Sequence, residues 1–187
     1  MDLRKARIIK TKAALKQTFV SLMDKYPPHS ITVVQLCRKA GLNRSSFYAH
    51  YGIMDDLIRD ILHDAVTEIC SSSDLNYTVS IENGGVPRTN VRDYLDSFLA
   101  NDTLLKFCTC EDSDRFRTDI IRIQAQISMN DQRDTVSYYP AYFQNSGVLS
   151  MLLEWIKNGM SIPKEELIEI IHQFSKAMYY PFIIMDS

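Results

Sequence analysis

Glycine, proline and cysteine are scarce in this sequence, and long apolar runs are absent. Its 187 residues include six glycines, six prolines and four cysteines. No window approaches the roughly 18 uninterrupted apolar residues of a membrane span, and the N-terminus has no apolar stretch of signal-peptide length. The cysteines are scattered through periodic segments, unlike the dense framework of a small secreted fold. We therefore expect a soluble, cytoplasmic protein with mostly free thiols and no membrane partner.

Motifs of common enzymes and metal sites are also missing. The sequence has no Gly-rich phosphate loop, no Ser nucleophile elbow and no pair of histidines at helical zinc-binding spacing. Cys108 and Cys110 form a Cys-x-Cys element, but no histidine or third cysteine lies nearby to complete a zinc site. A thiol enzyme or redox sensor there would require an exposed thiol with a lowered pKa. We expect no enzyme activity, no cofactor and no metal, and keep the thiol chemistry as an alternative.

Charge is present, and it is divided unevenly along the chain. Residues 1–51 carry ten Lys and Arg against two Asp, a balance of about +8. Residues 52–187 carry eleven Lys and Arg against twenty-one Asp and Glu, a balance of about −10. A basic segment of this kind suits a polyanion such as nucleic acid, although clustering on a solvated face is the other interpretation.

Apolar residues recur at helical spacing through most of the chain. The pattern predicts helices over residues 3–26, 33–40, 44–51, 53–70, 91–110, 113–130, 142–158 and 163–179. The first of these is expected to bury Ile8 and Tyr26 and to stop at Pro27 and Pro28. Residues 71–90 lose the period and hold Ser, Asn, Gly and Pro, so we expect a long loop. No strand pattern or internal repeat is visible, and the chain is predicted to be all-α.

Two short helices joined by a glycine occupy the basic segment, which makes a helix-turn-helix candidate. Gly41 provides the permissive backbone of the turn. In the second helix Leu42, Phe47 and Tyr51 are spaced to anchor it, which leaves the opposite face for a DNA groove. The residues expected to contact double-stranded DNA are Thr32, Asn43, Arg44, Ser45, Ser46, Tyr48 and His50, with Arg4, Lys5 and Arg7 as an N-terminal arm.

The expected contacts differ in what they can recognise. Arg44 can offer paired donors to a guanine edge, and Ser45 can bond a base edge or a phosphate. Tyr48 and His50 are better suited to phosphate oxygens. Thr32 can cap the first short helix, whose N-terminal amides are a natural phosphate contact.

The segment "SITVVQLCRKAGLNRSSFYAHYGIMDDL" resembles the DNA-binding region of the TetR (tetracycline repressor) family of bacterial transcription regulators. The positions that fall on the family's pattern are Thr32, Ala40, Gly41, Asn43, Phe47, Tyr48, His50 and Tyr51. Tyr51 stands where the family usually has Phe, and Met54 stands where a phosphate-binding Lys is common. The resemblance covers about the first 65 residues. It implies a helix-turn-helix domain over residues 1–52 and a helical regulatory and dimerisation domain over residues 53–187.

The later segment "GVLSMLLEWIKNGMSIPKEELIEII" is similar to the last two helices of one C-terminal subgroup of that family. The similarity implies that residues 141–180 form a four-helix interface with a second copy. A dimer is also expected because one short helix reads few bases, whereas a two-fold pair reads a palindromic operator. Expected interface residues are Val148, Leu152, Trp155, Ile156, Leu167, Ile171, Phe174 and Met178.

The resemblance further implies a repressor that is released when a small-molecule effector or a protein partner binds the C-terminal domain. Candidate pocket residues are Tyr94, Phe98, Phe107, Phe116 and Tyr142, although aromatic residues at helical spacing are usually core. An alternative is a protein with this fold that acts as a co-activator or adaptor through protein partners. The missing Lys at Met54 keeps this alternative open, although the retained Arg44, Ser45, Tyr48 and His50 argue against it. We expect a homodimeric DNA-binding regulator.

Overall fold

Helices make up nearly all of the chain that the structure describes. The computed structural model describes the backbone of residues 3–72, 88–128 and 135–185, and the side chains of residues 3–71, 88–127 and 138–177. Within these ranges there are nine α-helices, one short 3-10 helix and no strand. None of the described helices is long and apolar enough to cross a membrane. The all-α prediction is confirmed.

The N-terminal helices follow the predicted order. They are α1 (Leu3–Leu22), the 3-10 helix Pro28–Ser30, α2 (Val33–Ala40), α3 (Arg44–Tyr48) and α4 (Met54–Ser72). The bounds of α2 agree with the prediction because its end signals are local. The Thr32 side chain accepts a hydrogen bond from the Gln35 amide, and the Gln35 side chain accepts one from the Thr32 amide. This reciprocal capping box fixes where the helix begins.

The first predicted helix is too long, because α1 ends at Leu22 and a turn leads to the prolines. Ile8 and Tyr26, expected to be buried, are 37% and 43% exposed. The second short helix is also shorter than expected and ends at Tyr48, not at residue 51. The two wrong bounds, at the ends of α1 and α3, have the same cause. The apolar pattern in the sequence continues after the backbone has left the helix.

The C-terminal helices are α6 (Arg88–Ala100), α7 (Asp102–Thr109), α8 (Ser113–Ser128), α9 (Thr135–Lys157) and α10 (Lys164–Met185). The single helix predicted over residues 91–110 is wrong, because Asn101 interrupts it. Its side chain accepts a hydrogen bond from the Leu104 amide at 3.0 Å and so starts a new helix. α9 begins seven residues earlier than predicted and contains Pro140. Residues 73–87 of the predicted loop lie outside the described residues.

The turn between α9 and α10 closes with a Schellman motif. Gly159 adopts a left-handed conformation (φ 67°), and the amides of Gly159 and Met160 donate to the carbonyls of Ile156 and Trp155. Met160 is also left-handed (φ 56°), which is unusual for a residue with a side chain. The Trp155 indole donates to the Ile162 carbonyl at 2.8 Å and ties the turn to the core.

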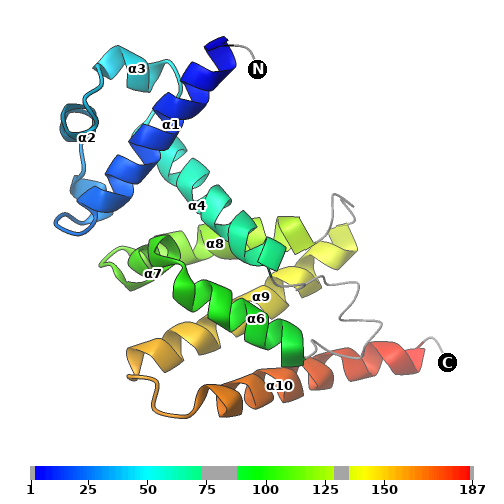
Figure 1. Cartoon of the computed structure of the whole chain (residues 1–187). Helices are drawn as coiled ribbons and strands as arrows, with labels where there is room; N and C mark the ends of the chain where they lie inside the picture. The colour runs from blue at the N-terminus through cyan, green and yellow to red at the C-terminus, as the bar shows by residue number, and fades with distance from the viewer. Residues whose placement is uncertain (1–2, 73–87, 129–134, 186–187) are drawn as a thin grey trace.

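The helices form two groups that α4 connects (Figure 1). We call α1–α3 the head and α6–α10 the body. α4 starts beside α1 and runs into the body, where it packs against α8 and α6. α8 packs on α9, and α10 lies along α6. One apolar core joins the two groups, since Leu15 and Phe19 of the head belong to the same buried cluster as Phe98 and Phe107 of the body.

Candidate nucleic-acid interface

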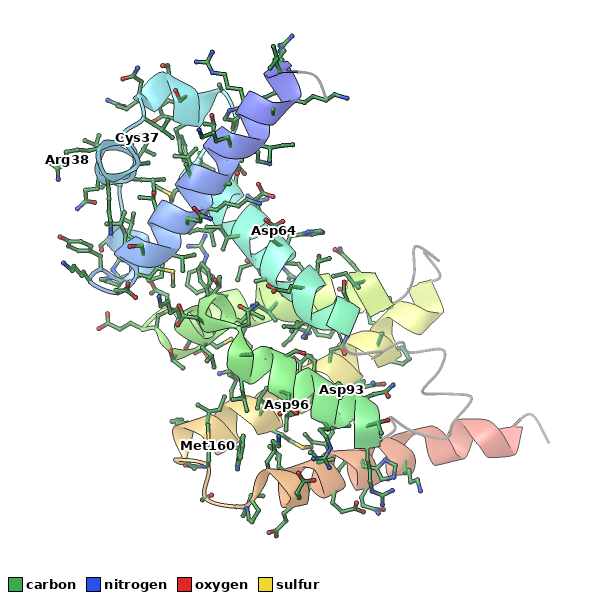
Figure 2. All side chains as sticks on the ribbon, in the orientation of Figure 1. Cys37, Arg38, Asp64, Asp93, Asp96 and Met160 are labelled. Carbon is green, nitrogen blue, oxygen red and sulfur yellow. The ribbon has the colours of Figure 1, made fainter. Side chains whose placement is uncertain are left out.

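The turn between α2 and α3 is set by Gly41. This residue is left-handed (φ 65°), and the Leu42 amide beyond it donates to the Cys37 carbonyl at 2.9 Å. A residue with a Cβ would be strained in this conformation. The turn therefore fixes the direction in which α3 leaves α2. Arg38, near the end of α2, lies at the outer edge of the head (Figure 2).

The anchoring residues of α3 are where the sequence predicted them. Phe47 is fully buried and Tyr51 is 5% exposed, while Leu42 packs partly buried against the core. The rings of Phe47 and Tyr51 lie 5.7 Å apart between centroids. A five-residue helix has little stability of its own, so these side chains hold it in place.

The opposite face of α3 is polar and open. Asn43, Arg44, Ser45 and Tyr48 are exposed, whereas Ser46 and His50 are half-buried. The Arg44 guanidinium lies 6.0 Å from the centre of the Tyr48 ring, within the range of a cation–π contact. This contact limits the conformations of Arg44 without using its hydrogen-bond donors.

The remaining predicted contacts of the head are also exposed. Arg4, Lys5 and Arg7 are exposed, and because α1 begins at Leu3 they project from a helix and not from an extended arm. Thr32 is exposed, but its hydroxyl is engaged in the capping box, where it donates to the Gln35 side chain at 2.9 Å. We therefore expect its hydroxyl to position α2 more than to contact a ligand.

Tyr51 makes a contact that the sequence reading missed. Its hydroxyl donates to Asp60 Oδ2 at 2.7 Å, and the same carboxylate accepts from Lys12 at 2.7 Å and from Lys16 at 3.0 Å. The ammonium of Lys12 also lies 5.3 Å from the centre of the Tyr51 ring. Asp60 thus connects α1, α4 and the turn after α3. The sequence did carry one signal for this contact, because Tyr51 stands where the TetR family usually has Phe.

The charge of Asp60 is stabilised by these contacts. Burial by itself would raise the pKa of Asp60, but the hydrogen bonds from Lys12, Tyr51 and Lys16 outweigh it and lower the pKa to about 2. Burial and the hydrogen bond to Asp60 raise the pKa of Tyr51. Tyr51 therefore stays neutral and remains a donor.

The head also contacts the body directly through aromatic rings. Phe19 of α1 stacks on Phe107 of α7, with centroids 6.3 Å apart and planes 14° from parallel. Phe107 meets Phe116 of α8 edge to face at 4.8 Å. Because all three side chains are at most 2% exposed, this contact is a continuous part of the core.

Three further side-chain contacts join residues 24–55 to residues 106–115. Lys106 bonds Asp24 at 2.7 Å, Arg115 bonds Asp55 at 2.5 Å, and the His29 ring contacts Asp112. Each joins residues at least 55 positions apart in the sequence. No local pattern could have predicted them.

The predicted aromatic pocket is largely filled by its own side chains. Tyr94, Phe98, Phe107 and Phe116 are at most 2% exposed. Tyr94 contacts Phe98 and Phe107 contacts Phe116, while Tyr142 is half-buried. The Tyr94 hydroxyl accepts a hydrogen bond from the buried Gln124 amide at 2.6 Å. These residues are placed as core, and their role as a ligand site stays a prediction.

The cysteines do not have the chemistry that a thiol enzyme needs. All four are free. Burial raises the pKa of Cys108 to about 12 and also raises that of Cys110, the opposite of the shift that activates a thiol. Glu169 and His172 stand at a Glu-x-x-His spacing, but Arg88 holds Glu169 at 2.6 Å. No cluster of metal-ligating side chains occurs among the described residues.

Most of the predicted interface residues lie inside the body. Val148, Leu152, Trp155, Leu167 and Ile171 are at most 7% exposed and have little surface left for a second chain. Ile156 is half-buried and Phe174 is 65% exposed, whereas the Met178 side chain lies outside the described residues.

Comparison with known proteins gives three findings. Residues 92–177 match the family model TetR_C_8, described as a transcriptional regulator C-terminal region. The chain is 28% identical over 64 residues to the uncharacterized HTH-type transcriptional regulator YxbF of Bacillus subtilis (strain 168). That match covers 34% of this chain and 17% of the length of YxbF. A solved structure described as a transcriptional regulator of Pseudomonas aeruginosa PAO1 aligns with a TM-score of 0.49 at 14% identity, over 90% of this chain and 89% of that one.

The family match spans most of α6 to α10, and the sequence match is to a protein of the helix-turn-helix type. Both describe regulators of transcription and not enzymes. Over residues 92–177 the chain is thus similar to the C-terminal region of transcriptional regulators of the TetR type.

Proposed function

We propose that this chain is a sequence-specific DNA-binding repressor that reads a short palindromic operator with α2 and α3. The observation that carries the proposal is the division of α3 into two faces, with Phe47 and Tyr51 buried and Asn43, Arg44 and Tyr48 exposed. A recognition helix needs both faces, one to hold its position and one to reach base edges and phosphates. The excess of positive charge in residues 1–51 supplies the attraction to phosphate.

The residues of the reading face take different roles. Arg44, with its donors unoccupied by the ring contact to Tyr48, reads a guanine edge, and Ser45 contacts a base or a phosphate. Tyr48 and the half-buried His50 bond phosphates and set the position of α3 in the groove. The DNA-binding domain covers residues 1–52, and the regulatory and dimerisation domain covers residues 53–187.

Selection of bound duplexes from a random pool tests this function. The wild-type protein should enrich a palindrome, and Arg44→Ala should lose preference at one position of each half-site, at a cost of about 1 to 3 kcal/mol. Tyr48→Phe should weaken all sequences alike, because a phosphate contact carries no base information. Arg122→Ala, which removes an exposed arginine from α8, is the matched control and should leave selection unchanged. Equal selection by wild type and Arg44→Ala would mean that α3 does not read bases.

The proposal includes a homodimer, whose contact face we place on exposed aromatic residues of α9 and α10. Tyr139 and Phe143 are each 67% exposed and lie four residues apart on one side of α9, and Phe174 of α10 is 65% exposed. Gly147 continues the α9 row, and a Cβ there would meet nothing within 4 Å. A neighbouring helix can approach closely at Gly147 while the aromatic residues supply the apolar area.

Sedimentation of two variants tests the dimer. The double variant Phe143→Glu/Phe174→Glu places charges on the apolar face and should sediment as a monomer, because an unpaired buried charge is costly. Tyr26→Glu, at an exposed aromatic residue of the head, is the control and should remain dimeric. A wild-type monomer would refute the homodimer, and a double variant that stays dimeric would place the contact elsewhere.

A co-activator or adaptor that works through protein partners is the second candidate. Met54 favours it, because the side chain is half-buried against the core and offers no cation to phosphate. The duplex selection separates the two functions. A clean dimer that enriches no sequence would support the adaptor, whereas an enriched palindrome would support the direct reader.

A further inference from the structure

A cleft lies between the head and the body. Its volume is about 410 Å³, within the range of roughly 300 to 1,000 Å³ that small-molecule sites occupy. α1, α4 and the α6–α7 region form its walls, and Asp64 marks the α4 side between the head and α6 (Figure 2). Lining residues that the argument uses are Lys16, Asp24, Asp64, Glu68 and Lys106.

The positive groups of the cleft are already saturated. Lys16 contacts Asp60 at 3.0 Å and Asp64 at 2.5 Å, and its side chain is 17% exposed. Lys106 contacts Asp24 at 2.7 Å and Asp102 at 2.8 Å, and its side chain is 25% exposed. Each ammonium therefore has two carboxylate partners and little surface to offer, which disfavours an anionic ligand.

The negative groups of the cleft have spare capacity. The side chains of Asp24 and Asp64 line the cleft and are 53% and 62% exposed, so both carboxylates remain accessible beside their lysine partners. Glu68 accepts a hydrogen bond from the neutral Asn101 amide at 3.1 Å, and it stands four residues after Asp64 on the same side of α4. Asp64 already pairs with Lys16, whereas the Asn101 amide that bonds Glu68 is neutral, so a bound ammonium would add a positive charge beside Glu68.

The lining of the cleft suits an organic cation better than a metal ion. No group of three or more His, Cys, Asp or Glu side chains in the described ranges is close enough to hold a metal ion. The cleft also has an apolar strip made by Val20, Ile61 and Ala65, on which methylene groups can lie. We propose that this cleft binds a small organic amine, with its ammonium group at Glu68 and Asp64 and its hydrocarbon part on the strip.

The position of the site gives it a regulatory role, which rests on the proposed DNA-binding function. An amine bound there lies between α1 of the head and the α6–α7 region of the body, which both line the cleft, so its affinity depends on how the head sits on the body. A second hollow of about 360 Å³, also lined by Lys106, borders the same joint between head and body. By linkage, an amine that binds one arrangement better changes operator affinity by the same factor.

Calorimetric titration of the full-length protein with 1,4-diaminobutane tests the site. Ionic strength is held constant, and the neutral 1,4-butanediol is titrated in parallel. The wild type should bind one diamine per chain and no diol. Glu68→Gln should weaken binding about tenfold, since it removes an unpaired charge from the ammonium site. Gln17→Arg, which adds a cation at the exposed rim, should weaken it similarly. Glu166→Gln, an exposed residue of α10 far from the cleft, should match the wild type.

The outcomes separate this inference from the proposed function. An absence of diamine binding, equal binding to wild type and Glu68→Gln, or equal binding of diamine and diol would each overturn the amine site. Duplex selection without amine tests DNA binding independently. Enrichment of an operator without diamine binding therefore overturns only the site, and diamine binding without enrichment overturns only the DNA-reading function and its regulation.

Discussion

The hydrogen bond between Tyr51 and Asp60 gives a sharp test of how the head is held together. Tyr51→Phe removes only the hydroxyl, and it restores the residue usual in the family at this position. The ring can keep its place against Phe47, so the change isolates one contact. We expect a less stable protein, even though the substitution makes the residue more apolar.

The size of the effect follows from what remains around the carboxylate. Hydrogen bonds to a charged partner contribute about 1.5 to 3 kcal/mol. Asp60 keeps Lys12 at 2.7 Å and Lys16 at 3.0 Å, so it is not left without a donor, and its side chain is 27% exposed. The loss should lie at the lower end, about 1.5 kcal/mol, which corresponds to a melting temperature lower by about 3 to 6 °C for a chain of this size.

Urea unfolding at one fixed protein concentration measures this loss, because a dimer's stability depends on concentration. Tyr48→Phe is the matched control, since its hydroxyl is exposed, and it should change stability by less than about 0.5 kcal/mol. In an Asp60→Ala background, Tyr51→Phe should lower the free energy of unfolding much less than it does in the wild type. A double-mutant cycle gives this result when the two residues interact directly.

Two results would refute the reasoning. An unchanged or higher urea midpoint for Tyr51→Phe would mean that burying the hydroxyl costs as much as its hydrogen bond contributes. An equal loss in the wild-type and Asp60→Ala backgrounds would mean that the effect does not pass through Asp60.

The same network should make stability acid-sensitive. The pKa of Asp60 is about 2 in the folded chain against an ordinary value of 3.8, so its contribution is complete above about pH 4 and is lost as the pH falls toward 2. The gap in urea midpoint between wild type and Asp60→Asn should narrow over that interval, and a constant gap would contradict the assignment. Substitutions at two residues with a left-handed backbone should change the free energy of unfolding in opposite directions. Gly41→Ala adds a Cβ at φ 65° and should lower the free energy of unfolding by about 1 kcal/mol. Met160→Gly removes the backbone strain at φ 56° and should raise it by about 0.5 kcal/mol. Unfolding midpoints that move the same way for both would count against backbone strain as the cause.

The sequence predicted the head in detail because its signals are local. Thr32 and Gln35 cap α2 within one turn, and Gly41 ends it, so both ends could be placed from neighbouring residues. The two faces of α3 follow from the spacing of Phe47 and Tyr51 along the chain. Such features depend on positions within a few residues of one another, which a single sequence displays directly.

The body was predicted less well, because periodicity identifies an apolar face but not what it packs against. Phe107, a predicted ligand-pocket residue, packs between Phe19 and Phe116, and its spacing along the chain indicates neither neighbour. Leu152, a predicted dimer-contact residue, is fully buried within its own chain, and its role at an interface stays a prediction. The break at Asn101 was missed because apolar spacing continues across it, while one side-chain hydrogen bond decides the backbone.

The contact between Phe19 and Phe107 limits how modular this regulator can be. Since the two rings share one core, a head separated after residue 52 would expose Phe19 to water and would retain only about fifty residues, near the lower limit for a domain that folds alone. A chimera that joins this head to the body of another regulator would meet the same difficulty. To fold, it would have to bring along an α7 surface that fits the Phe19 ring.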